Sequence, residues 1–199
     1  MTTALPAIWK LQNALCWRLA RIESPPLAAH VAPAELPLLM EILEEAGGLV
    51  DDPDSADKPF KSPQGVPSRF SDGSYGVFYA GLDLDTCVAE VSHHQARHFR
   101  ESSAPPMFVH FRPLRAKVSG SFVDVRRKHP ELHDLSSYAN SSAFGAKVLK
   151  AGAPGIAYRS VRHTGGECLA VFHRDCILSC KHSGTSITLA WDGATISKL

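Results

Sequence analysis

The chain has 199 residues, of which 44% are hydrophobic and 21% charged, a composition typical of a globular domain with an apolar core. Its 21 Lys and Arg residues are balanced by 20 Asp and Glu residues, which argues against the wide basic surface that nucleic-acid binding requires. No apolar run approaches the roughly 18 residues of a membrane span, and the N-terminus does not have the pattern of a signal peptide.

The first third of the chain contains one predicted strand and one predicted helix. Residues 1–13 are expected to form a loosely ordered lead-in to a single domain over 14–199, which begins with a strand over 14–20. Apolar residues at helical spacing, ended by two glycines, predict a helix over 33–48. The stretch 51–67 has four prolines and no periodicity, so we expect an inserted surface loop.

The middle of the chain predicts two short strands and a long helix. Residues 68–70 and 77–81 have strand-like composition, and the Gly- and Ser-rich segment 71–76 between them predicts a turn. A helix is predicted over 86–101, with Asp85 as its capping residue.

The rest of the chain consists mainly of predicted strands. Strands are expected over 107–119, with an interruption at Pro113, and over 121–126, 155–161, 168–174 and 186–192, with one helix over 141–152. The strands and helices do not alternate regularly, as they do in a doubly wound fold, so the fold class predicted is α+β.

Three side chains between residues 69 and 90 could form part of a binding site. Arg69, beside a Gly/Ser turn, could hold a phosphate or a carboxylate, or could form a salt bridge at a strand end. Tyr79 could be an aromatic wall for a flat ring, or a core tyrosine with a satisfied hydroxyl. Glu90 lies beside an apolar helical face, where a carboxylate is costly unless it has a partner or a function, although most glutamates are solvated.

Two further polar residues lie in or beside predicted strands. Arg18 interrupts an apolar strand, and its side chain could reach solvent at the edge or bind an anion. Ser160 ends a strand, and its hydroxyl could form a turn hydrogen bond or contact a ligand.

The cysteines and histidines do not predict a metal site. The spacing of Cys168, His173, Cys176, Cys180 and His182 lacks the close pairs that zinc sites use. The odd number of five cysteines, without a secretory signal, indicates reduced thiols and a cytoplasmic protein. No local signature supports a cysteine nucleophile, but an unrelated hydrolase that uses Cys or His stays an alternative.

Taken in order, these residues resemble the RES domain, the toxin half of a bacterial toxin–antitoxin family. The similarity is carried by Arg69-Phe70, Gly76, Tyr79-Ala80 and Ala89-Glu90, by WRLA at 17–20, by AKVSGSFVDV at 116–125 and by GAPGIAYRSVRHTGGECLAVF at 152–172. It covers roughly residues 14 to 192. The long loop 51–67 and the N-terminal extension depart from the shorter members of the family.

The resemblance implies an ADP-ribosyltransferase-like fold, with a bent, split β-sheet around a central cleft and flanking helices. It also implies that the protein consumes NAD+, with water, phosphate or a protein side chain as the acceptor of ADP-ribose, and that an Xre-type helix-turn-helix antitoxin is its partner. The functional positions of the family fall on Arg18, Arg69, Tyr79, Glu90 and Ser160.

These residue types suit the cleavage of the nicotinamide–ribose bond. We expect Glu90 to stabilise the positive charge that develops on the ribose, and Arg69 with Arg18 to hold the pyrophosphate. Tyr79 would stack on nicotinamide or ribose, and Ser160 would donate a positioning hydrogen bond. NAD+ is then a substrate, and no metal, membrane or nucleic acid is required. The alternative is a RES-fold binding or regulatory subunit without catalysis.

Overall fold

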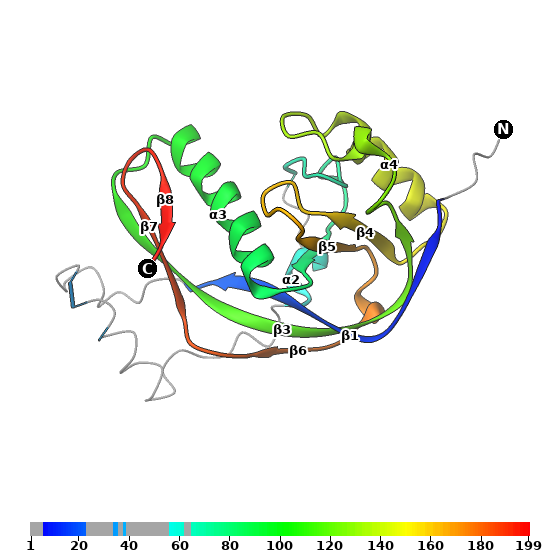
Figure 1. Ribbon diagram of the computed structural model, residues 1–199, viewed down its shortest axis with the longest axis horizontal. Helices are drawn as coiled ribbons and strands as arrows, with labels where there is room; N and C mark the ends of the chain where they lie inside the picture. The colour runs from blue at the N-terminus through cyan, green and yellow to red at the C-terminus, as the bar shows by residue number, and fades with distance from the viewer. Residues whose placement is uncertain (1–5, 23–33, 36–37, 39–55, 62–64) are drawn as a thin grey trace.

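The computed structural model describes residues 6–22, 34–35, 38, 56–61 and 65–199 (Figure 1). The helix predicted over 33–48 lies almost entirely outside the described residues, as do parts of the loop expected over 51–67. Within the described part of the chain, no helix is long and apolar enough to cross a membrane.

The described chain is an α+β structure built on one eight-stranded sheet, which confirms the predicted fold class. The strands are β1 (Ile8–Arg21), β2 (Phe78–Gly81), β3 (Met107–Asp124), β4 (Gly155–Arg159), β5 (Glu167–Val171), β6 (Ile177–His182), β7 (Ile187–Trp191) and β8 (Ile196–Lys198). The helices are α2 (Lys58–Lys61), α3 (Leu84–Glu101) and α4 (Ala139–Lys150), with 3₁₀ turns at Pro130–Leu132 and Arg174–Cys176.

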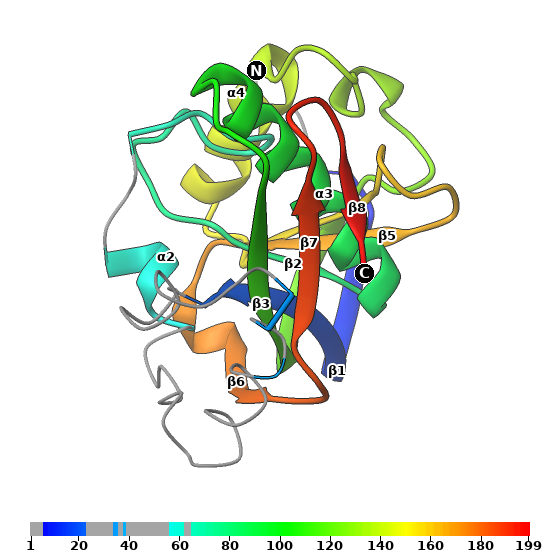
Figure 2. The ribbon, with the colours of Figure 1, turned by 90° about the vertical axis from the view of Figure 1, so that its left-hand side faces the viewer.

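The long strand β3 organises the sheet because it pairs with four other strands. One edge pairs antiparallel with β1, and the other edge pairs in succession with β7, β6 and β4. The pairings β1–β2, β2–β5, β5–β4, β4–β3 and β3–β1 close a ring of five strands. Figure 1 shows β3 and β1 as a bow along the base of the molecule, with α3 and α4 on its concave side. Seen from the side, β3, β7 and β8 form a separate arm of the sheet (Figure 2).

Each part of this architecture encloses its own apolar cluster. The strand ring surrounds a cluster that includes Phe78, Phe122 and Leu169. A second cluster includes Phe70, Val148 of α4 and Ile156 of β4, and a third lies between α3 and the β3–β7 arm. The two longer helices are thus held on the sheet by burial of their apolar faces.

Pro113 does not interrupt β3, although an interruption was predicted there, and β3 also continues into the separate strand predicted over 121–126. β7 pairs with β3 up to Phe111, and β6 pairs with it from Leu114 onward. Pro113 falls in the gap between these two partners, and its carbonyl accepts a hydrogen bond from the Ser183 amide at 3.0 Å. A proline is tolerated in a strand where the missing N–H has no partner to bind, so the chain continues through it.

Strand β1 begins at Ile8 rather than at residue 14, so the lead-in expected over residues 1–13 is wrong for residues 8–13. The register of β1 on β3 shifts between Leu11 and Ala14, where Asn13 takes a positive φ of 53°. Such an irregularity lets the strand resume pairing beyond it. The guanidinium of Arg126 lies 3.8 Å from the centre of the Trp9 ring, which also holds this segment in place.

Three shorter segments also differ from prediction. Residues 68–70 form a tight turn rather than a strand, closed by paired backbone bonds between Ser68 and Ser71. β6 and β8 were not predicted, because β6 has weak alternation and β8 has only three residues.

Helix α3 is capped by Asp83, so the predicted cap at Asp85 is wrong. The Asp83 Oδ1 atom accepts a hydrogen bond from the Thr86 amide at 2.6 Å, and Asp85 lies in the first turn. The sequence LDLDT offers two aspartates two residues apart, and the point at which the chain leaves β2 decides which of them caps the helix.

Replacement of the capping residue tests this assignment. Asp83→Ala is expected to lower the free energy of unfolding by about 1 to 2 kcal/mol, because an orphan amide at the helix start loses its acceptor. Asp85→Ala removes only a favourable charge near the helix N-terminus and should cost about 0.5 kcal/mol. Urea denaturation of the two variants is the measurement, and equal losses would contradict Asp83 as the cap.

Candidate functional site

A hydrogen bond between Glu90 and Ser160 joins α3 to the loop that follows β4. The Ser160 hydroxyl donates to Glu90 Oε1 at 2.6 Å. Its oxygen accepts the backbone N–H groups of Arg162 and His163, at 3.0 and 2.9 Å. The serine is therefore fully engaged and fixes one carboxylate oxygen. The other oxygen, Oε2, has no hydrogen-bond partner among the described residues, which leaves it available to a ligand.

A second contact, one helical turn away, holds the same loop against α3. The Thr86 hydroxyl lies 2.7 Å from Asp83 Oδ2 and 2.8 Å from His163 Nδ1. Since the carboxylate can only accept, the hydroxyl donates to Asp83 and accepts from His163 Nδ1–H. A Cβ on Gly166 would lie 2.4 Å from the Thr86 hydroxyl oxygen, so only glycine allows this approach. Thr86 and Glu90 thus bind the 160–166 loop from the same helical face.

Tyr79 fastens the 68–71 turn to β2. Its hydroxyl accepts the Phe70 amide at 2.9 Å and lies 2.8 Å from the Ser68 hydroxyl. Burial raises the pKa of Tyr79 to about 12, so the hydroxyl keeps its proton at neutral pH. The turn it holds carries Arg69, and the conformation of Arg69 therefore depends on Tyr79.

Arg69 projects from this turn into the segment after β3. The side chain is only 6% exposed, and Nη1 donates to the carbonyl oxygens of Leu132 and Asp134, both at 3.1 Å. Its guanidinium lies 5.1 Å from the centre of the Tyr138 ring. Arg69 thus braces the segment 132–138, which we call the β3–α4 loop.

Arg18 connects β1 to β2 beside these groups. Its Nη1 atom donates to the Tyr79 carbonyl at 3.0 Å, and its guanidinium lies 4.9 Å from the centre of the Phe78 ring. The arginine in the apolar strand is therefore directed into the molecule rather than toward solvent at an edge.

The buried ring of Tyr158, in β4, shows that the predicted residues lie in one region. Burial raises the pKa of Tyr158 well above its usual value; the negative charge of Glu90 adds to the rise, and the positive charge of Arg69 opposes it. The Tyr158 ring packs edge-on against Phe70, with 5.0 Å between the ring centroids, and Phe70 follows Arg69 and donates its amide to the Tyr79 hydroxyl. Tyr158 lies two residues before Ser160, so this ring contact links the Glu90–Ser160 pair to Arg69, Tyr79 and Arg18, and the structure brings the five predicted residues into one region.

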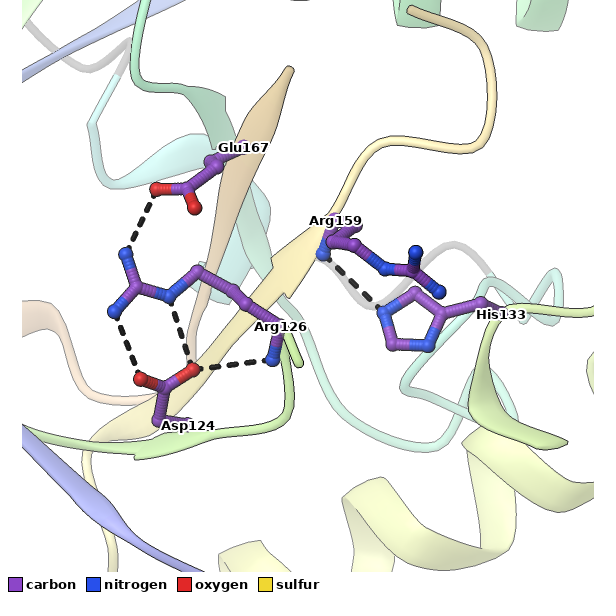
Figure 3. A network of polar contacts seen from close by, with 5 residues as sticks. All are labelled: Asp124, Arg126, His133, Arg159 and Glu167. Carbon is purple, nitrogen blue, oxygen red and sulfur yellow. Dashed lines mark hydrogen bonds and ion pairs between the residues drawn. The ribbon is translucent and has the colours of Figure 1, made fainter. Parts of the chain in front are cut away.

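Three arginines of this region have backbone carbonyls, rather than carboxylates, as partners. Arg126 binds the carboxylates of Asp124 and Glu167, each at 2.7 Å (Figure 3). Arg97 and Arg174 are likewise paired with carboxylates elsewhere in the described chain. Arg18, Arg69 and Arg162, in contrast, donate to neutral backbone carbonyls. Their positive charges are therefore not neutralised by a paired carboxylate, which favours the binding of an anion.

His133 links the β3–α4 loop to β4 (Figure 3). Its Nε2 atom accepts the Arg159 amide at 3.2 Å, and Nδ1 lies 3.0 Å from the His129 carbonyl oxygen. A carbonyl only accepts and an amide only donates, so the ring is neutral with its proton on Nδ1. Burial lowers the pKa of His133, and the nearby charges of Arg159 and Arg69 lower it further.

The cysteines have little nucleophilic character. Burial raises the pKa of Cys16 to about 12 and that of Cys87 to about 11, and it also raises the pKa of Cys168, Cys176 and Cys180. Because the thiolate is the nucleophile, raised pKa values argue against a hydrolase that uses a cysteine.

Several residues of the site were not assigned a role from the sequence. They are Asp83, Thr86, Tyr158, Arg162, His163 and the β3–α4 loop. Arg162 and His163 lie in the segment 152–172 that carries the family resemblance. A serine whose hydroxyl accepts the backbone amides two and three residues later forms a turn that can be recognised from sequence. The β3–α4 loop contributes through backbone carbonyls, which leave no signal in the sequence.

Comparison with known proteins gives a family match and a similar curated protein. The model of the RES domain matches residues 47–192. The Uncharacterized protein y4oC of Sinorhizobium fredii is 29% identical over 143 residues, which is 71% of this chain and 59% of that protein. The chain thus matches over about three fifths of the length of this relative. The family match begins at residue 47, whereas the resemblance noted from the sequence begins near residue 14.

A solved structure has the same fold at low sequence identity. It is the crystal structure of the M. tuberculosis MbcT–MbcA toxin–antitoxin complex, matched with a TM-score of 0.51 and 9% identity. The match covers 94% of this chain and 87% of the other. The ADP-ribosyltransferase-like α+β fold expected from the sequence is therefore confirmed.

The neutral His133 predicts that acid destabilises the β3–α4 loop. Its folded-state pKa lies below the unfolded value of about 6.5, so its contribution is complete above pH 6.5 and is lost as pH falls below it. Between pH 7 and pH 5 the free energy of unfolding should fall, with a slope of up to about 1.4 kcal/mol per pH unit for each such group.

His133→Asn should reduce this slope, because the asparagine does not titrate. Denaturant titrations at several pH values, compared by slope rather than by absolute stability, provide the measurement. Above pH 7.5 imidazoles are neutral in both the folded and the unfolded state, so the pH slopes of the wild type and the variant should agree there, which provides the control. An unchanged slope in the variant would show that His133 is not held neutral.

Proposed function

We propose that this chain, which belongs to the RES domain family, is the toxin of a bacterial toxin–antitoxin pair and cleaves the nicotinamide–ribose bond of NAD+. The proposal is supported chiefly by one arrangement: the Glu90 carboxylate, fixed by Ser160 at 2.6 Å, lies in a region where three arginines have only neutral partners. A dinucleotide with a cationic nicotinamide ribose and an anionic diphosphate is complementary to both features.

The chemistry needs a single carboxylate. The bond from ribose C1′ to the nicotinamide nitrogen breaks, and its electron pair neutralises the positively charged ring. The ribose is left as an oxocarbenium-like cation, which an acceptor oxygen or nitrogen then attacks. Since the leaving group departs without protonation, no general acid is required. Glu90 stabilises the cation by charge and binds ribose hydroxyls through Oε2.

The other residues act on position and charge. Ser160 fixes the rotamer of Glu90, so that the carboxylate does not have to reorganise during the reaction. Arg18 and Arg69 supply positive charge for the pyrophosphate, although Arg69 is mostly buried and acts largely from behind the loop it braces. Tyr79 uses its hydroxyl to hold the turn, and its ring is proposed as the aromatic wall of the site.

The acceptor is water, phosphate or a protein side chain. The fold match to a toxin solved with its antitoxin supports an antitoxin partner for this chain. We propose an Xre-type helix-turn-helix antitoxin, and a cytoplasmic site of action where NAD+ is available. No metal is invoked, because the leaving group already carries its charge.

Release of nicotinamide from NAD+ tests the proposed reaction. Glu90→Gln should reduce the rate on the order of a hundredfold, because the stabilising charge is lost while the acceptor for Ser160 is kept. Ser160→Ala should reduce it by about tenfold, through loss of one hydrogen bond to a charged group. Glu101→Gln, at the exposed end of the same helix, is the matched control and should keep the wild-type rate.

Three results would speak against this function. A purified wild-type protein that releases no nicotinamide would favour a RES-fold subunit without catalysis. Release that Glu90→Gln leaves unchanged would place the reaction elsewhere. Expression should also arrest growth for the wild type and Glu101→Gln but not for Glu90→Gln, and equal toxicity of all three would contradict a toxin mechanism centred on Glu90.

A further inference from the structure

Arg162 lies on a loop whose position relative to Glu90 is fixed at two points. Ser160 binds Glu90, and His163 binds Thr86 one turn earlier on α3. Between them, the backbone amide of Arg162 donates to the Ser160 hydroxyl. The backbone of Arg162 is therefore separated from the Glu90 carboxylate by one serine side chain, and it cannot move away without breaking that contact.

The side chain of Arg162 extends from this point toward the β3–α4 loop. Its Nη2 atom donates to the Leu135 carbonyl at 2.8 Å. Burial, followed by the positive charge of Arg162, lowers the pKa of His93 in α3 to about 4. His93 follows Glu90 by three residues and shares its side of the helix. The Arg162 guanidinium thus lies against the β3–α4 loop, while its backbone is tied to Glu90 through Ser160.

Arg69 and Arg162 bind the same loop from two elements. Arg69 takes the carbonyls of Leu132 and Asp134, and Arg162 takes the next carbonyl, that of Leu135. Neither side chain is paired with a carboxylate in the described part of the chain. Two guanidinium groups on neighbouring carbonyls repel each other, and a bound polyanion would relieve this repulsion.

The two arginines differ in what they can offer a ligand. Arg69 is 6% exposed and uses Nη1 on two carbonyls, whereas Arg162 is half-buried and uses Nη2 on one. A guanidinium has five N–H donors in a planar fork that suits phosphate oxygens. Arg162 therefore has donors to spare at the surface, while Arg69 serves mainly as a brace.

We infer that Arg162 is the residue that contacts the diphosphate of a dinucleotide, with Arg69 holding the β3–α4 loop behind it. The identification of the ligand as a dinucleotide rests on the proposed function. The binding of a diphosphate by Arg162 rests only on the arrangement of charge. The fixed loop places this contact beside Glu90, so one ligand can meet the carboxylate with its ribose and Arg162 with its diphosphate.

Binding of ADP-ribose and of inorganic pyrophosphate to the Glu90→Gln protein, followed by calorimetry, tests this inference without turnover. Adding Arg162→Gln should weaken both ligands by at least about tenfold, since a charge-assisted contact is lost. Adding Arg162→Lys should weaken them less, because the charge is kept and only the fork is lost. Adding Arg97→Gln removes a positive charge from the exposed side of α3 and should change both affinities less than about twofold.

The outcomes separate this inference from the proposed reaction. Unchanged affinity in Arg162→Gln, or no binding of either ligand to the Glu90→Gln protein at millimolar concentration, would overturn the inference. A lower melting temperature with unchanged affinity would also overturn it, as Arg162 would then be a structural brace. If the wild type releases no nicotinamide but Arg162→Gln loses pyrophosphate binding, the reaction is wrong and the diphosphate contact stands.

Discussion

The hydrogen bond from Ser160 to Glu90 connects the two halves of the molecule on which the site depends. Glu90 belongs to α3, which packs on the β3–β7 arm, and Ser160 follows β4, which belongs to the strand ring. A carboxylate beside an apolar helical face needs a partner, and here another element of the fold supplies one. The same contact that gives one carboxylate oxygen its partner also fixes the position of the carboxylate.

The sheet topology explains why these elements meet. β3 is long enough to pair with β7 at one end and with β4 at the other, and its bow carries both parts on one concave side (Figure 1). The chain then leaves β3 through the β3–α4 loop, which Arg69 and Arg162 hold by three carbonyls. Neutral acceptors stabilise the loop but leave the arginine charges in place, so the features that support the loop also make the region attractive to an anion.

The sequence predicted the regular elements better than the contacts between them. The helices over 86–101 and 141–152 were located within two residues of their observed starts, Leu84 and Ala139, because their apolar residues recur with a clear period. β6 and the continuity of β3 could not be predicted, since both depend on which partner lies at the next edge. The cap of α3 was misplaced for a similar reason, as the path out of β2 decides between two aspartates.

The site was predicted by residue but not by role. Arg69, Tyr79 and Glu90 were singled out by residue type and by their likeness to a known pattern. No local sequence pattern shows that Tyr79 holds the turn of Arg69 or that Arg69 binds backbone carbonyls. Both contacts depend on the tertiary structure. Arg162 and Thr86 were missed because their partners lie 27 and 77 residues away in the chain.

The most direct test of the account is a crystal structure of the Glu90→Gln protein with NAD+ bound. The account predicts that the nicotinamide ribose lies within hydrogen-bonding distance of residue 90 and that the diphosphate lies against the arginines without carboxylate partners. A dinucleotide bound at another surface, with residue 90 and Ser160 unoccupied, would contradict it.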